Sequence, residues 1–214
     1  MLWFVTNLTR LRILAAVLGF SACGGATYTV ESDAPLYTLT NLRADPRGVV
    51  SSLGYADQAL IPVCTPVQIT SVRGRQVVFV ANGRRYRYVA HRSSPSPIDQ
   101  HVQRLFGPTC PDLARFSAED RAGVQQGRVF QGMTKAGVVV AMGYPPERFT
   151  PTLDADVWTY VRRQGGRLQV QFAGGQVVGL VDPRAPQVVA QPLQPVVQPA
   201  GYGGAQVGVT VAAP

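Results

Sequence analysis

The stretch that decides the fold is residues 132–181, GMTKAGVVVAMGYPPERFTPTLDADVWTYVRRQGGRLQVQFAGGQVVGLV. It begins with a short apolar segment that carries helix signals at both ends. Thr134 suits the N-cap of a helix, because its hydroxyl accepts a hydrogen bond from an otherwise unpaired amide of the first turn. Gly143 suits the left-handed position after a helix end, and the two prolines behind it cannot continue a helix. The sequence therefore predicts a short helix between Thr134 and Gly143.

Three runs with the composition of β-strands follow, at 157–162, 168–173 and 177–181. Glycine pairs stand in both connections, at 165–166 and 174–175, where a hairpin turn requires positive φ. The runs therefore predict an antiparallel meander of three strands.

The first of these runs places Trp158 and Tyr160 on one face, because alternate side chains of a strand point to the same side. A three-stranded sheet needs a cover to be stable. We expect this face to pack on the predicted helix through three apolar side chains, Val138, Val139 and Met142.

The motifs GMTKAGV, AMGYPP, WTY and VQF with GQVVGLV occur in this order, and together they resemble the BamE (SmpA/OmlA) family, small lipoproteins of the outer-membrane β-barrel assembly machinery. The resemblance implies an ααβββ two-layer domain over 117–182, with its first helix beginning at the capping sequence 117–120. One departure is Gly137, which stands in the middle of the second helix and costs about 1 kcal/mol relative to alanine there.

The N-terminus reads as an export signal. Arg10 and Arg12 precede the apolar run 13–20, which is too short to span a bilayer but fits the core of a signal peptide. The small residues before Cys23 resemble the bacterial lipobox, in which cleavage precedes a lipid-modified cysteine. We expect loss of residues 1–22, lipidation of Cys23, a tether over 23–35, and a location on the periplasmic face of the outer membrane. The alternative is a secreted protein cut nearby, with Cys23 incidental.

Charge and cysteine content set further bounds. The formal net charge is +8, and loss of the two signal-peptide arginines leaves +6. The arginines are scattered and no nucleic-acid-binding motif is present, so we predict no nucleic-acid partner. Cys64 and Cys110 form a candidate disulfide in an oxidising compartment, and the bond would close a loop of about 45 residues. The alternative is a pair of buried thiols.

Residues 36–92 read as about five short strands separated by turn signals, which predicts a small β-barrel. Asn82-Gly83 between two strand-like runs is the strongest hairpin signal. The segment 61–80, IPVCTPVQITSVRGRQVVFV, resembles the strand-turn-strand of bacterial SH3-like domains, with Cys64 in the place of a glycine. Another small β-barrel is the alternative.

The remaining segments complete the predicted fold. Residues 93–116 predict a linker with one short helix, in which Ile98, Val102 and Leu105 share a face. Residues 183–214, rich in Pro, Gln, Val and Gly, predict a disordered tail. The predicted fold class is α+β: a small SH3-like β-barrel followed by an ααβββ two-layer domain, with a disordered C-terminal tail.

The sequence offers no catalytic constellation. His91 and His101, which we expect on the surface, have no His or Cys cluster around them that could hold a metal. Phosphate-binding loops and the Gly-x-Ser-x-Gly motif are absent from the sequence. Asp154 and Asp156 fit an exposed loop better than an acid–base pair. We therefore predict no catalytic residue, no metal and no cofactor.

The predicted function is a non-enzymatic scaffold that binds proteins in envelope assembly, a role that the BamE resemblance implies. Tyr144, Arg162 and Arg163 are the candidate partner contacts, because each stands at an exposed turn. The alternative is peptidoglycan binding by the SH3-like region through an aromatic groove, with four candidate residues, Tyr37, Tyr55, Tyr86 and Tyr88. A hydrolase, the third class, lacks a nucleophile–base set.

Overall fold

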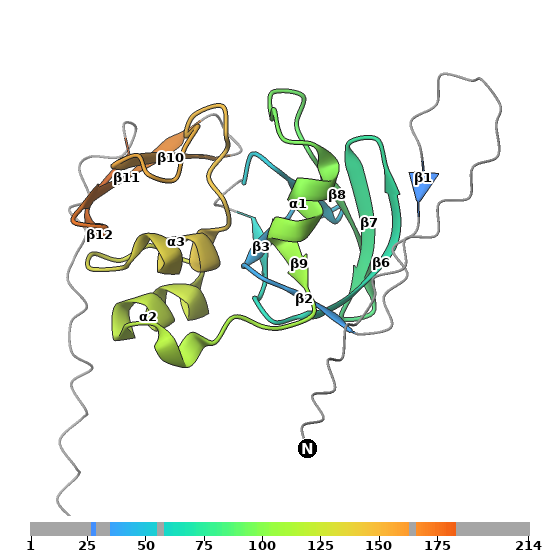
Figure 1. The fold of residues 1–214 in the computed structure, drawn as a ribbon, viewed down its shortest axis with the longest axis horizontal. Helices are drawn as coiled ribbons and strands as arrows, with labels where there is room; N and C mark the ends of the chain where they lie inside the picture. Colours follow the sequence, from blue (N-terminus) through green and yellow to red (C-terminus); the bar gives the residue numbers. More distant parts are fainter. Residues whose placement is uncertain (1–26, 29–34, 55–57, 163–165, 183–214) are drawn as a thin grey trace, which may run out of the picture.

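The computed structural model describes residues 35–54, 58–162 and 166–182, and the backbone of 27–28. This part of the chain is mostly β: a nine-stranded sheet curled into a half-barrel, a three-stranded sheet, and three short α-helices (Figure 1). None of these helices is long or apolar enough to cross a membrane. The predictions for Cys23, the signal peptide, most of the tether, Tyr55, Arg163 and the tail lie outside the described residues.

The large sheet has the strand order β5-β3-β4-β8-β7-β6-β2-β9, with β1 added beside β6. Its strands are β1 (Thr27–Tyr28), β2 (Leu36–Thr38), β3 (Leu42–Ala44), β4 (Val49–Ser51), β5 (Ala59–Ile61), β6 (Pro66–Arg73), β7 (Gln76–Ala81), β8 (Arg84–Val89) and β9 (Phe106–Gly107). The β7–β8 turn is the predicted Asn82-Gly83, with φ of 49° and 72°. β4 runs parallel to β8, and the other described pairs are antiparallel.

The predicted α+β fold class is wrong, because the structure is β-rich. In the described part, no pairing joins the two ends of the large sheet, β5 and β9, so the predicted closed SH3-like barrel is instead a curled half-barrel. The helices are too short to make an α+β class: α1 (Ile98–Leu105), α2 (Ala118–Gln126) and α3 (Lys135–Met142) have eight, nine and eight residues. Gly127 and Gly143, both at positive φ, end α2 and α3 after two turns.

The segment predicted as a linker contributes to the large sheet. α1 packs on its core through Ile98, Val102 and Leu105, and β9 pairs with β2. The ring of Phe106 lies 5.0 Å from that of Phe79, measured between centroids. We refer to residues 35–107 as the large-sheet unit.

The three-stranded sheet lies on α3, and α3 on α2 (Figure 1). Its strands β10 (Val157–Val161), β11 (Arg167–Ala173) and β12 (Gln176–Val181) form the predicted meander. Trp158 and Tyr160 are fully buried in one cluster with Val138 and Met142, which confirms the predicted packing of this strand face. We refer to residues 117–182 as the small-sheet unit.

The contact between α2 and α3 explains the glycine in the middle of α3. Ser117 and Asp120 form the capping box of α2, and the Asp120 carboxylate also accepts hydrogen bonds from the backbone N–H and the hydroxyl of Thr134, at 2.8 and 3.0 Å. This buried carboxylate therefore holds the start of both helices. It lies directly against Gly137, where a Cβ would overlap its oxygen.

We expect Gly137→Ala to destabilise the fold by about 2–4 kcal/mol, because the added methyl group has no room beside Asp120. Helix propensity alone predicts the opposite sign, about 1 kcal/mol of stabilisation. Urea unfolding measures the difference. Ala136→Gly, at the exposed neighbouring position, should cost only about 1 kcal/mol. A Gly137→Ala variant as stable as the parent chain would contradict this account of α3.

Candidate functional site at the junction of the two units

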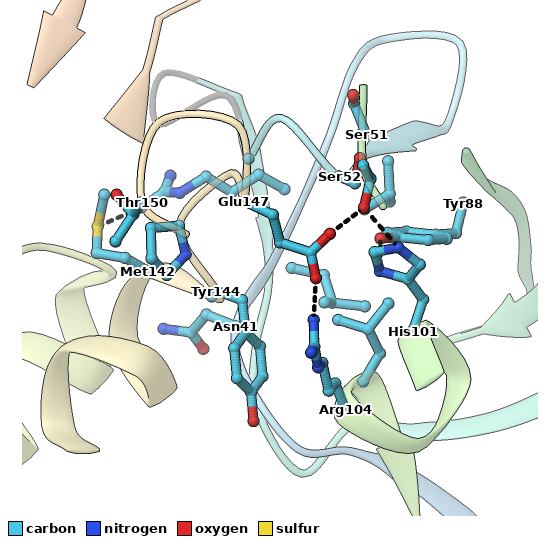
Figure 2. Close-up of a pocket in the computed structure, with 18 of the residues that line it drawn as sticks. Asn41, Ser51, Ser52, Tyr88, His101, Arg104, Met142, Tyr144, Glu147 and Thr150 are labelled. Atoms are coloured by element: carbon cyan, nitrogen blue, oxygen red, sulfur yellow. Dashed lines mark hydrogen bonds and ion pairs between the residues drawn. The ribbon is translucent and has the colours of Figure 1, made fainter. Parts of the chain in front are cut away.

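A cavity of about 150 Å³ lies where the large-sheet unit meets the small-sheet unit (Figure 2). Tyr88 and Arg104 line it from the large-sheet unit, and Tyr144, Glu147 and Leu153 from the small-sheet unit. The wall is mixed, because apolar side chains and prolines stand beside these polar groups. The contacts that hold the two units together determine its shape.

Asn41, which stands just before β3, is the central contact of the junction. Its side-chain amide donates to the carbonyls of Val124 at 2.7 Å and Ala141 at 3.0 Å, near the ends of α2 and α3. Its side-chain oxygen accepts from the N–H of Val63 at 2.8 Å, and its own N–H donates to the carbonyl of Val140 at 2.8 Å. One buried residue thus caps two helices of the other unit.

Arg43 adds a positive charge at the same helix ends. Its guanidinium donates to the carbonyl of Gly127, the residue that closes α2, and to the carbonyl of Gln58 at 3.2 Å. The last carbonyls of a helix carry partial negative charge, so a cation is favourable there. Gly127 has its positive φ of 61° at this contact, where a Cβ would press on both Arg43 and Leu60.

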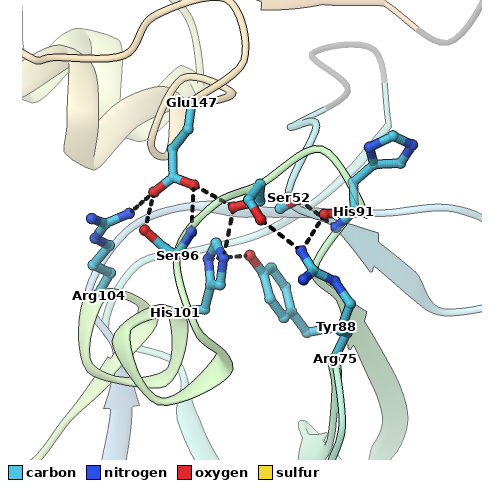
Figure 3. Close-up of polar contacts among 9 residues, drawn as sticks. Ser52, Arg75, Tyr88, His91, Ser96, His101, Arg104 and Glu147 are labelled. Atoms are coloured by element: carbon cyan, nitrogen blue, oxygen red, sulfur yellow. Dashed lines mark hydrogen bonds and ion pairs between the residues drawn. The ribbon is translucent and has the colours of Figure 1, made fainter.

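Glu147 joins the two units on the cavity side (Figure 3). It belongs to the loop after α3, and its carboxylate accepts from the guanidinium of Arg104 at 2.6 Å and from the hydroxyls of Ser94 and Ser96. The N–H of Ser96 donates to it as well, at 3.4 Å. All of these donors come from the large-sheet unit.

The surroundings of Glu147 keep it ionised. Partial burial by itself would raise the pKa of this carboxyl, but the hydrogen bonds from Ser94, Ser96 and Arg104 outweigh that effect and lower the pKa to about 2. Because its oxygens already accept four hydrogen bonds, the carboxylate has little capacity to act as a base toward a bound molecule. Its role is to hold the junction.

His101 continues this network into the core of the large-sheet unit. Its Nε2 lies 3.0 Å from the Ser94 hydroxyl and its Nδ1 lies 2.8 Å from the Tyr88 hydroxyl. Burial lowers the pKa of His101, so the imidazole is neutral at pH 7. Burial also raises the pKa of Tyr88, which keeps the phenol protonated and able to donate to Nδ1.

The direction of these hydrogen bonds decides what Ser94 can do. Its single proton goes to the Glu147 carboxylate, so its oxygen accepts from the Nε2–H of His101, and Nδ1 of His101 accepts from Tyr88. A serine nucleophile needs the opposite arrangement, in which the histidine accepts the serine proton. The hydrogen-bonded network Tyr88–His101–Ser94–Glu147 therefore connects the two units and has no nucleophile in it.

The predicted partner contacts fall in different places. Tyr144 lines the cavity, with the Arg104 guanidinium 5.5 Å from its ring centroid. Arg162, on the β10–β11 turn, lies away from the cavity and pairs with Asp182 at 3.2 Å. Of these two residues, Tyr144 therefore lies at the cavity and Arg162 does not.

Cys64 and Cys110 lie together as the sequence predicts, with their Cα atoms 5.2 Å apart, inside the range of disulfides. The pair links the β5–β6 connection to the segment after β9. Cys64 has φ of 63°, a conformation that favours glycine.

The tyrosines proposed for a peptidoglycan groove do not share one surface in the described part of the chain. Tyr88 points into the core, Tyr86 stacks on Phe79 at 5.4 Å between centroids, and Tyr37 lies on β2, three strands away from β8. Across the described ranges, no group of three or more His, Cys, Asp or Glu residues is arranged to hold a metal ion.

The surface position predicted for His101 is wrong, since only 6% of the residue is exposed. Its place in the sequence contained the signal: Ile98, His101 and Val102 follow an i, i+3, i+4 spacing on the buried face of α1. Glu147 and Ser94 carried no such signal. They are 53 residues apart in the chain and meet only through the junction.

We expect Asn41→Asp to destabilise the protein by about 3–5 kcal/mol, because a carboxylate cannot donate to the Val124 and Ala141 carbonyls and brings a negative charge to two helix ends. Chemical denaturation measures the loss. Asn82→Asp, the same change in an exposed turn, should have little effect. Equal stabilities for the two variants would show that Asn41 does not hold the junction.

We expect acid to weaken the junction in two stages. The folded-state pKa of His101 lies below its ordinary value of 6.5, so stability falls as the pH drops below that value. The folded-state pKa of Glu147, about 2, lies below its ordinary value of 4.5, so its contribution is complete above pH 4.5 and is lost toward pH 2. Glu147→Gln should lower stability at pH 7 by about 2–4 kcal/mol.

The same variant should also flatten the stability curve between pH 4.5 and 2 while keeping the decline that begins near pH 6.5. Urea midpoints measured across this range test both statements. A Glu147→Gln curve that runs parallel to that of the parent chain would refute the assignment.

No model of a known protein family matches this chain, and neither does any curated protein or solved structure. The resemblances of 61–80 and 132–181 to known families therefore rest on the quoted motifs alone. What the junction cavity does has to be argued from its geometry.

Proposed function

We propose that this chain is a non-enzymatic lipoprotein of the cell envelope, acting as a scaffold that binds protein partners at the outer membrane. The observation that supports the proposal is the cavity at the junction of the two units. The polar groups in its wall already form hydrogen bonds with one another. Such a wall presents a fixed shape and offers no activated nucleophile.

The size of the cavity supports binding of a protein segment. Its volume of about 150 Å³ lies below the 300–1,000 Å³ that is typical of cofactor and small-molecule sites. It suits one or two side chains inserted by a partner. Leu153, 39% exposed, and Tyr144 supply apolar contact area at its edge, and an aromatic anchor beside an arginine is typical of interface hot spots.

The envelope location rests on the sequence. The lipobox-like residues before Cys23 and the pair Cys64–Cys110 both suit an oxidising compartment outside the inner membrane. The order of motifs in 132–181 supports a role in the assembly of envelope proteins, by resemblance to BamE. Non-covalent binding through a pre-formed cavity is consistent with such a role.

The test is site-specific photo-crosslinking in cells that make the protein naturally. A photoreactive residue in place of Leu153 should capture outer-membrane or assembly proteins, because this side chain stands at the cavity edge. The same residue in place of Gln125, exposed on α2, should capture few or none of them. Equal capture from both positions, or capture of no envelope protein, would reject the proposal.

The same preparation reports on the anchor. Mass spectrometry of the purified chain should find Cys23 as a lipid-modified N-terminus. An unmodified N-terminus elsewhere would remove the lipoprotein part of the proposal and leave the binding part standing.

A further inference from the structure

The outer face of the large sheet is lined by arginines. Along β8 the side chains alternate, so Tyr86 and Tyr88 point inward while Arg85 and Arg87 point outward and are exposed. Arg73, at the end of β6, is exposed at the other end of the same surface. We refer to Arg73, Arg85 and Arg87 as the arginine face.

The strand register makes this surface continuous. Arg87 lies between Val78 of β7 and Val49 of β4, Arg85 lies opposite Val80, and Arg73 lies opposite Gln76. The valines are half-buried between the arginine side chains. The exposed Arg47 lies in the turn before β4, next to Gly48, whose carbonyl accepts from the Arg87 N–H. The exposed arginine side chains therefore lie on a partly apolar surface formed by the valines.

The charge of the chain is concentrated on this unit. Residues 35–107 contain nine arginines and three aspartates, a formal charge of +6, whereas residues 108–182 contain eight basic and seven acidic residues, a formal charge of +1. Within the described part of 35–97 the acid is Asp45, whose carboxylate accepts from the Val49 N–H at 2.8 Å. In the described structure, no ion pair involves Arg73, Arg85 or Arg87.

A surface of this kind fits phosphate groups held in a plane. The guanidinium group binds phosphate oxygens in a bidentate manner. The outward positions of β6, β7 and β8 hold proline, glutamine, threonine, serine, valine and arginine and no aromatic side chain, so the face lacks the stacking platforms that single-stranded nucleic acids require. Half-buried valines between cations suit the headgroup region of a bilayer.

The position of the N-terminal strand β1 also favours a membrane as the partner of the arginine face. β1 pairs with the end of β6, with Thr27 opposite Arg73. Cys23 is four residues from Thr27, a reach of at most about 14 Å. A lipid attached at Cys23 would therefore insert close to the arginine face, a point that rests on the proposed function.

We propose that the arginine face docks this protein on a membrane surface that carries anionic phospholipid headgroups. The test uses residues 23–214 with Cys23→Ser, so that no acyl chain contributes. This protein should bind vesicles of phosphatidylcholine mixed with phosphatidylserine, bind pure phosphatidylcholine weakly, and dissociate as salt screens the charges.

Arg85→Gln together with Arg87→Gln should lower the partition coefficient for the anionic vesicles roughly 25-fold, because each cation at such a surface contributes about 5-fold. The matched control is Arg115→Gln together with Arg128→Gln, two exposed arginines outside the large-sheet unit, which removes the same charge. The control should lose less than 3-fold if binding belongs to the face. Thermal unfolding of both variants verifies that they remain folded.

Three results would overturn the proposal: no binding of the parent chain to anionic vesicles, equal losses for the two double variants, or tighter binding to a single-stranded oligonucleotide or an acidic peptide than to vesicles. Because the acyl anchor is absent here and crosslinking at Leu153 is read in cells, this proposal and the proposed function can fail independently.

Discussion

A buried amide that must satisfy its hydrogen bonds fixes how the two units of this protein meet. Asn41 is 2% exposed, and both its side-chain donors and its oxygen find partners only when the ends of α2 and α3 lie against the start of β3. Any sliding of the units would leave a buried donor unpaired, at a cost of about 1–3 kcal/mol for each group. The cavity keeps its shape because this contact tolerates one arrangement of the units.

An ion pair between the two units, on the cavity side of the junction, stabilises the same arrangement. Glu147 is a carboxylate from the small-sheet unit whose donors all belong to the large-sheet unit, and the ion pair with Arg104 is partly buried. Such a pair contributes little net energy, but removing one partner leaves an uncompensated charge. His101, neutral and hydrogen-bonded on both ring nitrogens, ties this pair to Tyr88 in the core. Specific geometry, more than net stability, is what the network supplies.

Local signals in the sequence predicted local structure well. Each of these signals acts on the backbone within a few residues of itself. The helix ends at Thr134 and Gly143 and the turn at Asn82-Gly83 are where the sequence predicts them. The fold class was wrong because β3, β4 and β9 are strands of two or three residues, too short to show alternation. The junction could not be predicted for a related reason: the hydrogen bonds between the two units join residues separated by 43 to 100 positions, and no periodicity encodes such pairs.

The alternation of β8 also relates the two proposed surfaces to each other. Arg87 points to the outside of the curled sheet, while its neighbour Tyr88 points inward to His101 and the cavity network. Adjacent residues of one strand face opposite sides, so the arginine face and the cavity lie on opposite faces of the sheet. A body that rests on a membrane through the first leaves the second open to the aqueous side. If both proposals hold, a lipid layer on the arginine face and a protein partner at the cavity would therefore not compete.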